Sequence, residues 1–110
     1  MGAHPGLASL RSLCGQVSLL TDGGTTVAHL PGVQFQAGAQ RVRRDLLLWP
    51  SARDGYQTRL FLSERVVGSV QRAWTSFQLC GRTWWAVSWQ GVPATLPWIE
   101  IVASHLRAFK

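Results

Sequence analysis

The apolar residues of this chain change their spacing once, close to residue 96. From Leu96 to Phe109 they recur at intervals of three and four, which is typical of an amphipathic helix. Pro97 falls in the first turn of that helix, where its missing amide donor costs nothing. Glu100 near the start and His105 near the end suit the helix dipole. Before residue 96 the apolar residues lie in short runs between glycines and prolines, which indicates antiparallel strands.

The expected fold is therefore α+β: an antiparallel β-meander with a short N-terminal helix and a C-terminal helix covering one of its sides. Leucines spaced by three predict the first helix over Gly6–Leu13, and Leu30-Pro31-Gly32 is expected to break the chain. The expected extended segments are 16–30, a hairpin around Asp22-Gly23-Gly24, and then 33–35, 42–49, 56–67, 74–79 and 84–89. At 110 residues we expect one domain over 1–110, with 1–15 as a short N-terminal helix or tail.

Basic residues outnumber acidic ones, with 11 Lys+Arg against 5 Asp+Glu. Together with six tryptophans they supply the groups that contact phosphates and stack on bases. The bases are spread along the chain, however, and do not interleave with aromatic residues on one strand face. A small basic nucleic-acid-binding domain is thus an alternative that the sequence permits but does not favour.

Metal and cofactor sites are not predicted. The histidines and cysteines form no Cys-x-x-Cys or His-x-x-x-His pair, and no glycine-rich phosphate loop precedes the C-terminal helix. The N-terminus lacks the features of a signal peptide, and the longest strongly apolar run, Leu46–Trp49, is far too short to cross a bilayer. We expect a cytoplasmic protein without a membrane partner.

Cys80 is the candidate for chemistry. Gly81 frees the backbone beside it, and the positive charge of Arg82 would favour a thiolate. The segment from Gln78 to Trp89 holds no histidine that could act as a base. Free cysteines are also among the most buried residue types, so these residues alone leave open whether Cys80 is a nucleophile or part of the core. Cys14, at the edge of the first helix, is expected to be structural.

Several short motifs follow one another along the chain: Leu30-Pro31-Gly32-Val33, Asp45-Leu46-Leu47-Leu48-Trp49-Pro50, Gly55-Tyr56 and Arg59-Leu60-Phe61-Leu62. In this order they resemble small bacterial members of the ubiquitin-conjugating enzyme superfamily. Cys80 is then followed by Trp89, Pro93 and the helix from Leu96, as the catalytic cysteine of that family is followed by a tryptophan, a proline and a helix. The resemblance covers residues 16–110, and it implies the family's fold, a meander of antiparallel strands with flanking helices.

The resemblance implies that the chain is a ubiquitin-conjugating-like transferase with Cys80 as its catalytic residue. Cys80 would accept a ubiquitin-like modifier from an activating enzyme as a thioester, which an amine would then attack. The residues expected to support this site are Gln78, Gly81, Arg82, Thr83, Ser88 and Trp89. Further implications are a JAB-type peptidase in the same pathway and a role in bacterial anti-phage defence.

One family motif is missing from this sequence. Leu62-Ser63-Glu64-Arg65-Val66 stands where the family has His-Pro-Asn ahead of the cysteine. The groups that could replace its asparagine are the side chains of Gln78, Thr83 and Ser88 and the backbone amide of Gly81. The alternative is a conjugating-enzyme variant that has lost catalysis and acts as a binding adaptor.

Overall fold

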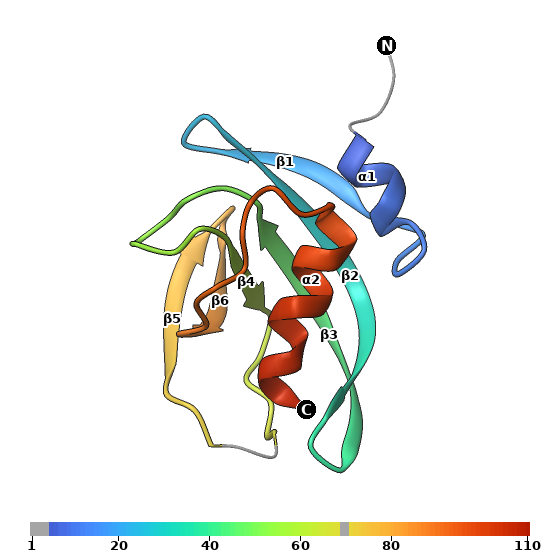
Figure 1. Ribbon diagram of the computed structural model, residues 1–110, viewed down its shortest axis with the longest axis vertical. Coiled ribbons are helices and arrows are strands. Elements are labelled where there is room, and N and C mark those ends of the chain that lie inside the picture. Colours follow the sequence, from blue (N-terminus) through green and yellow to red (C-terminus); the bar gives the residue numbers. More distant parts are fainter. Residues whose placement is uncertain (1–4, 69–70) are drawn as a thin grey trace.

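The computed structural model describes residues 5–68 and 71–110 and has the predicted α+β class. Its elements, in chain order, are α1 (Pro5–Leu10), β1 (Ser18–Asp22), β2 (Thr25–Ala37), β3 (Gln40–Trp49), β4 (Arg59–Leu62), β5 (Trp74–Leu79), β6 (Arg82–Val87), α2 (Trp98–Leu106) and a short 3₁₀ turn, η1 (Arg107–Phe109). Figure 1 shows α2 crossing one face of the sheet, and Gly6 of α1 lies against Trp98 at the start of α2. Both helices thus lie on one side of the sheet, as predicted.

The six strands form one sheet with the order β1-β2-β3-β4-β6-β5, and each neighbouring pair is antiparallel. The predicted meander is correct from β1 to β4 and wrong after it, because β6 rather than β5 lies beside β4. Since β4 and β5 are both antiparallel to β6, they run in the same direction. β1 and β5 are the two edges of the sheet.

The predicted break at Leu30-Pro31-Gly32 is instead a bulge inside one long strand. β2 continues from Thr25 to Ala37, and its register against β3 shifts between Leu30 and Val33. Gly32 has a φ of 67°, and its amide donates a 2.8 Å hydrogen bond to the Asp45 carboxylate on β3. The strand continues because a side chain on β3 satisfies the irregular backbone, a contact that the local sequence does not reveal.

The strand predicted over 56–67 is much shorter in the structure. Only Arg59–Leu62 forms β4, and it pairs with β6 at one position, Leu62 with Trp85. The side chains of β4 alternate between the two faces of the sheet, because Leu60 packs with the helices and Phe61 with the opposite side. The gap expected between the extended segments 56–67 and 74–79 includes residues 69 and 70, which lie outside the described residues.

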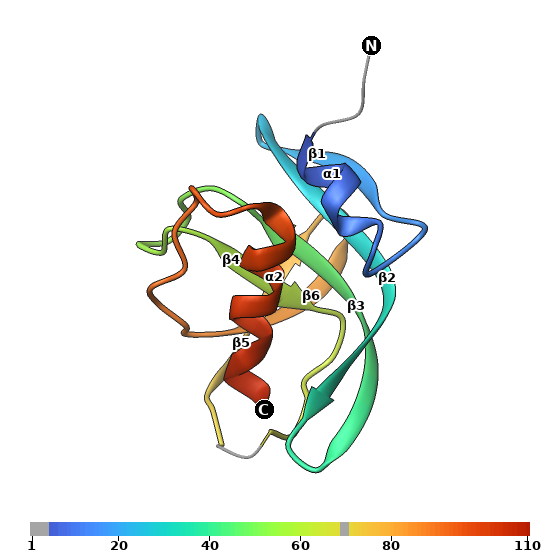
Figure 2. The same cartoon turned by 45° about the vertical axis from the view of Figure 1, so that its right-hand side comes forward.

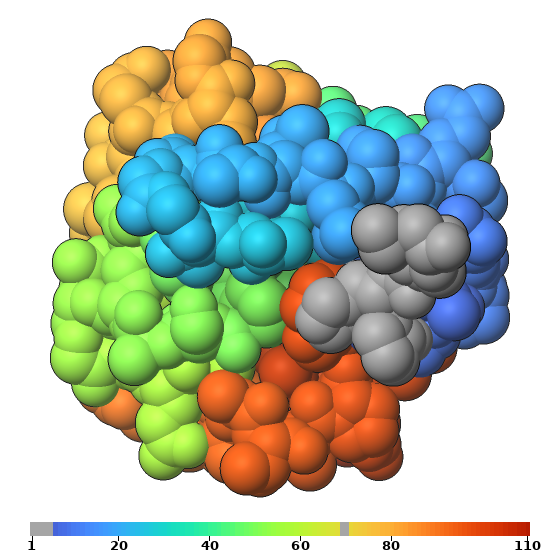
Figure 3. Space-filling model, turned by 90° about the horizontal axis from the view of Figure 1, so that it is seen from above, coloured from blue at the N-terminus to red at the C-terminus, as the bar shows by residue number. Residues whose placement is uncertain are grey.

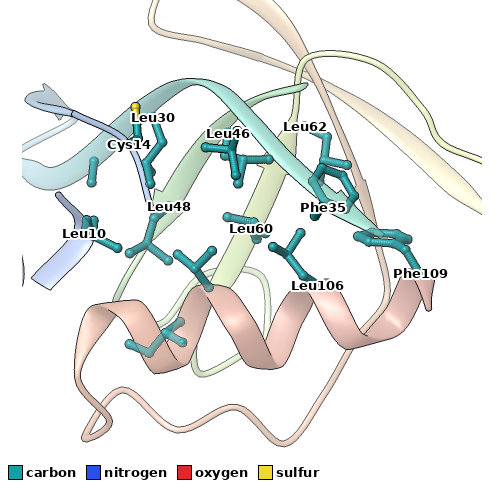
Figure 4. Packing of buried hydrophobic residues seen from close by; sticks show 14 of the residues in the cluster. Leu10, Cys14, Leu30, Phe35, Leu46, Leu48, Leu60, Leu62, Leu106 and Phe109 are labelled. Carbon is teal, nitrogen blue, oxygen red and sulfur yellow. The ribbon is translucent and has the colours of Figure 1, made fainter. Parts of the chain in front are cut away.

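The main core lies between the helices and the sheet. In Figure 4, Leu106 of α2 points at the sheet, where Leu60 and Leu62 of β4 lie. A helix of nine residues is not stable alone in water. The buried side chains of Ile101, Val102 and Leu106, each contributing about 1.5–3 kcal/mol, hold α2 in place. No helix among the described residues is long and apolar enough to cross a membrane.

A second core fills the other face of the sheet, which curls around it (Figure 2). Residues from β2, β3, β4, β5 and β6 meet there: Val27, Leu47, Trp49, Phe61, Leu79, Trp84 and Ala86. His29 on β2 contacts Trp84 on β6 edge to face at 5.9 Å, although these strands are not neighbours in the sheet. The curl therefore brings the β1–β2 hairpin close to the β5–β6 hairpin.

Candidate functional site

Cys80 lies at the tip of the β5–β6 hairpin, exposed and not in a disulfide. Cys80 and Gly81 form a two-residue turn with φ angles of 49° and 77°. Two positive φ angles define a type I′ turn, whose first position is usually taken by asparagine, aspartate or glycine. A cysteine there carries backbone strain. Cys80 is therefore not part of the core, a point that the sequence alone left open.

The carboxylate of Asp22 faces the Cys80 thiol from the β1–β2 hairpin. The Sγ atom of Cys80 donates a long hydrogen bond to Oδ2 of Asp22, with 3.9 Å between the two atoms. Figure 3 shows the two hairpins side by side, with β1–β2 in blue and β5–β6 in yellow-orange. Partial burial, and then the negative charge of Asp22, raise the pKa of the Cys80 thiol above its ordinary value. The surroundings of Cys80 therefore favour the neutral thiol over the thiolate.

Arg82 does not act on Cys80 as predicted. Its guanidinium forms a 3.3 Å salt bridge with Asp45 on β3 and lies over the Trp84 ring, 4.5 Å from the centroid. The Asp45 carboxylate also accepts the Gly32 amide, and this hydrogen bond is the main reason why the pKa of Asp45 is lowered. Arg82 thus stabilises the β2 bulge through Asp45. It is not among the groups that shift the pKa of Cys80, which is raised.

The other predicted supporting residues do not gather around the thiol. Gln78 and Thr83 flank the turn, but the Gln78 amide donates to the Thr83 hydroxyl at 2.6 Å, so they pair with each other. Ser88 and Trp89 follow β6, whose six residues span roughly 20 Å. There, the Tyr56 hydroxyl donates a 2.8 Å hydrogen bond to the Ser88 hydroxyl, and the Trp89 indole donates a 3.0 Å hydrogen bond to the Ser104 carbonyl. Trp89 therefore links the segment after β6 to α2.

Replacing Asp22 by asparagine should make Cys80 more reactive. The substitution removes the charge that opposes ionisation of the thiol, so the pKa of Cys80 should fall and the thiolate fraction at neutral pH should rise. The rate of alkylation by iodoacetamide, followed against pH by mass spectrometry, measures this effect. Cys14 serves as the internal control, because it is buried and its thiol donates to the Pro31 carbonyl at 3.1 Å. If the pH profile of Cys80 alkylation did not change, Asp22 would not be a cause of the raised pKa of Cys80.

A cleft of about 930 Å³ lies on the helix side of the sheet, away from Cys80. It is bounded by the segment after β4, by the first residue of β5, by β6 and by η1. The lining residues are Glu64, Arg65, Val66, Val67, Gly68, Gln71, Arg72, Trp74, Trp85 and Phe109. Its size is at the upper end of the range for small-molecule pockets. The sequence does not predict it, because its walls come from four separate segments.

Arginines and aromatic rings are in contact with one another at this cleft. Trp74 stacks on Phe109 with a centroid distance of 5.4 Å and an interplanar angle of 8°. The Arg65 guanidinium lies 4.9 Å from the centre of the Trp85 ring. Arg72 donates to the Ala108 carbonyl at 2.7 Å and lies over the ring of Trp89, which is outside the lining set. These contacts join residues from separate segments, so the sequence does not reveal them.

His105 is buried rather than exposed at the end of α2. Its Nε2 lies 2.9 Å from the hydroxyl of Thr58, and that hydroxyl also lies 2.9 Å from the Val92 carbonyl. The hydroxyl has one proton, which it donates to the carbonyl, so His105 must donate from Nε2. Burial, and then the charge of Arg59, lower the pKa of His105 to about 4. His105 is therefore neutral near pH 7, and the prediction that it acts as a cation on the helix dipole is wrong.

The described residues bring together no cluster of three or more histidine, cysteine or acidic side chains that could hold a metal ion. The chain matches no protein-family model, and neither a curated protein nor a solved structure matches it significantly.

Proposed function

We propose that this chain is a conjugating-enzyme variant that acts as a binding adaptor, holding a ubiquitin-like modifier without forming a thioester. The order of its motifs resembles the ubiquitin-conjugating superfamily, and an antiparallel sheet with helices on one side is compatible with that family's coarse architecture. Under this proposal it works in the cytoplasm, in a pathway with an activating enzyme and a JAB-type peptidase that serves anti-phage defence.

The observation that carries the adaptor function is the position of Asp22. A thioester carrier needs a thiolate to attack the incoming thioester, and nearby positive charge or a base increases the thiolate fraction at neutral pH. Cys80 instead faces the carboxylate of Asp22, and partial burial, followed by this charge, raises the pKa of its thiol, while Arg82 is engaged by Asp45. Among the described residues, no histidine is hydrogen-bonded to Cys80. Binding of a modifier requires none of these groups, so the loss of the His-Pro-Asn motif does not impair an adaptor.

A reconstitution tests this proposal. The chain is mixed with its cognate activating enzyme, the modifier and ATP, and the products are separated on a non-reducing gel. We expect no adduct on the wild-type chain. In calorimetry, we expect the wild type and Cys80→Ala to bind the modifier with affinities that agree within about twofold. A reductant-sensitive adduct that Cys80→Ala abolishes would refute the adaptor function, as would absence of modifier binding.

The second candidate is the thioester carrier, and the exposure of Cys80 favours it. A thiol on the tip of a hairpin is accessible to a bulky protein partner, which a buried thiol is not. Docking of an activating enzyme that displaces Asp22 would remove the opposing charge. In the same reconstitution the carrier gives a thioester on Cys80, and Asp22→Asn should then form it faster than the wild type.

A further inference from the structure

We propose that the open edge of β5, together with the arginine-bearing cleft at its first residue, binds an extended acidic segment of a partner protein. The segment would add to the sheet as a seventh strand. This inference rests on the proposed adaptor function and specifies the chemistry of the partner. It is independent of any reaction at Cys80.

The backbone of β5 has one free side. β5 pairs with β6, and no further backbone hydrogen bond involves it among the described residues. The type I′ turn makes the flanking residues, Leu79 and Arg82, a hydrogen-bonded pair, and such pairs then alternate along the two strands. The amide and carbonyl groups of Trp74, Ser76 and Gln78 therefore point away from β6. This edge offers three residues for pairing with another strand.

The edge lacks the features that usually prevent strand addition. Proteins protect exposed edges with charged residues, prolines or bulges. The six residues of β5, Trp-Thr-Ser-Phe-Gln-Leu, contain no charge and no proline, and their register with β6 is regular throughout. An edge of this kind is suited to accept an extended peptide through main-chain hydrogen bonds, while neighbouring pockets select side chains.

The cleft provides such a pocket and sets the charge of the partner. Trp74 is both the first residue of β5 and part of the cleft wall, so a strand paired with β5 extends towards the cleft. Trp85 and Phe109 give the cleft an apolar surface. Arg65 and Arg72 line it, and neither forms a salt bridge within the described part of the chain. An apolar side chain flanked by carboxylates complements these walls.

The same features argue against two other occupants. A second copy of this chain carries a net charge of +6, so pairing of β5 with β5 would bring like charges together. A nucleic acid supplies phosphates but cannot pair with the amide and carbonyl groups of a strand edge. It would also need open ring faces for stacking, whereas one face of Trp74 is covered by Phe109 and one face of Trp85 by Arg65.

The first test measures binding of defined probes by fluorescence anisotropy. The probes are a labelled peptide of alternating valine and glutamate, its valine–lysine counterpart, and an oligothymidine. We expect the glutamate peptide to bind at least about tenfold more tightly than either of the others. Equal binding of the lysine peptide, or preferential binding of oligothymidine, would overturn the proposal.

Variants locate the site. Ser76→Pro removes an outward amide that pairing with β6 does not use, and it should weaken the glutamate peptide by about tenfold or more, whereas Ser76→Ala should stay within about twofold. Arg65→Glu should also weaken binding by about tenfold. Its control is Arg11→Glu, which makes the same charge change at an exposed position after α1. Unchanged affinity of Ser76→Pro or Arg65→Glu would refute the assigned surface.

Hydrogen exchange of the wild-type chain avoids dependence on the folding of the variants. Adding the glutamate peptide should slow exchange of the Ser76 and Gln78 amides, while the already paired Phe77 amide changes little. Protection elsewhere on the chain would refute the docking surface. Modifier binding with protection away from β5 would leave the adaptor function intact and disprove only this inference. Binding of the peptide without binding of the modifier would leave the docking surface intact and refute the adaptor function.

Discussion

Replacing Trp84 by alanine should lower the free energy of unfolding by about 3–5 kcal/mol, the largest stability loss that we expect from one substitution here. Trp84 is only 1% exposed and is the largest fully buried side chain of the second core. Its ring contacts His29, and its indole nitrogen donates to the Leu79 carbonyl at 3.2 Å. The substitution leaves a cavity inside the curl of the sheet, because the strands around it cannot collapse independently.

Trp85 provides a matched control for this prediction. It is the next residue of β6, but its side chain lines the cleft on the opposite face and is only partly buried. Trp85→Ala should cost about 1 kcal/mol, since it loses partial burial and the contact with Arg65. Urea unfolding followed by circular dichroism measures both variants. Similar losses for the two would show that the second core does not hold the curled sheet together.

Elements with a strong local pattern were predictable from the sequence. The β1–β2 turn at Gly23-Gly24 and the β5–β6 turn at Cys80-Gly81 lie where glycine permits a positive φ. The period of three and four after Leu96 predicts α2, because one apolar face must be buried. These features depend on residues within a few positions of one another, so a single sequence contains enough information to predict them.

Features that depend on distant partners were not predictable. The bulge in β2 is stabilised by Asp45, and the ionisation of Cys80 is opposed by Asp22, which is 58 positions away in the chain. Arg82 is two residues from Cys80, yet its side chain pairs with Asp45. Because Arg82 is close to Cys80 in the sequence, an activated thiol was predicted. The curl of the sheet instead places the carboxylate of Asp22 beside that thiol. The candidate residue was thus identifiable from the sequence, but its electrostatic surroundings were not.

The proposed binding surface and the candidate thiol lie towards opposite ends of β5. The cleft lies at the start of β5, and Cys80 follows the end of the same strand. A partner strand on the β5 edge would therefore reach from the cleft towards the hairpin tip. Under the two proposed functions, the adaptor and the carrier would use the same docking surface, and the ionisation of Cys80 would distinguish them. For this reason, Asp22→Asn is the decisive variant for the reaction, and Ser76→Pro for binding.

Lowering the pH should destabilise the wild-type chain through His105. Its pKa is about 4 in the folded chain and close to 6.5 in the unfolded chain. Because the folded-state value is lower, the unfolded chain binds more protons between these pH values, and protonation favours unfolding. The stability associated with neutral His105 is fully present above pH 6.5 and is lost progressively as the pH falls towards 4. The loss should be about 3 kcal/mol, since one pKa unit corresponds to about 1.4 kcal/mol.

His105→Gln isolates this contribution from that of the carboxylates. The glutamine amide can donate to the Thr58 hydroxyl as the Nε2 of His105 does, but it does not titrate. Acidic residues such as Asp45 contribute equally to acid destabilisation in both proteins, so they cancel in the difference. Urea unfolding at several pH values between 7 and 4 should show a smaller decline for the variant, by about 3 kcal/mol across the range. Parallel declines for the two proteins would mean that burial and Arg59 do not lower the pKa of His105.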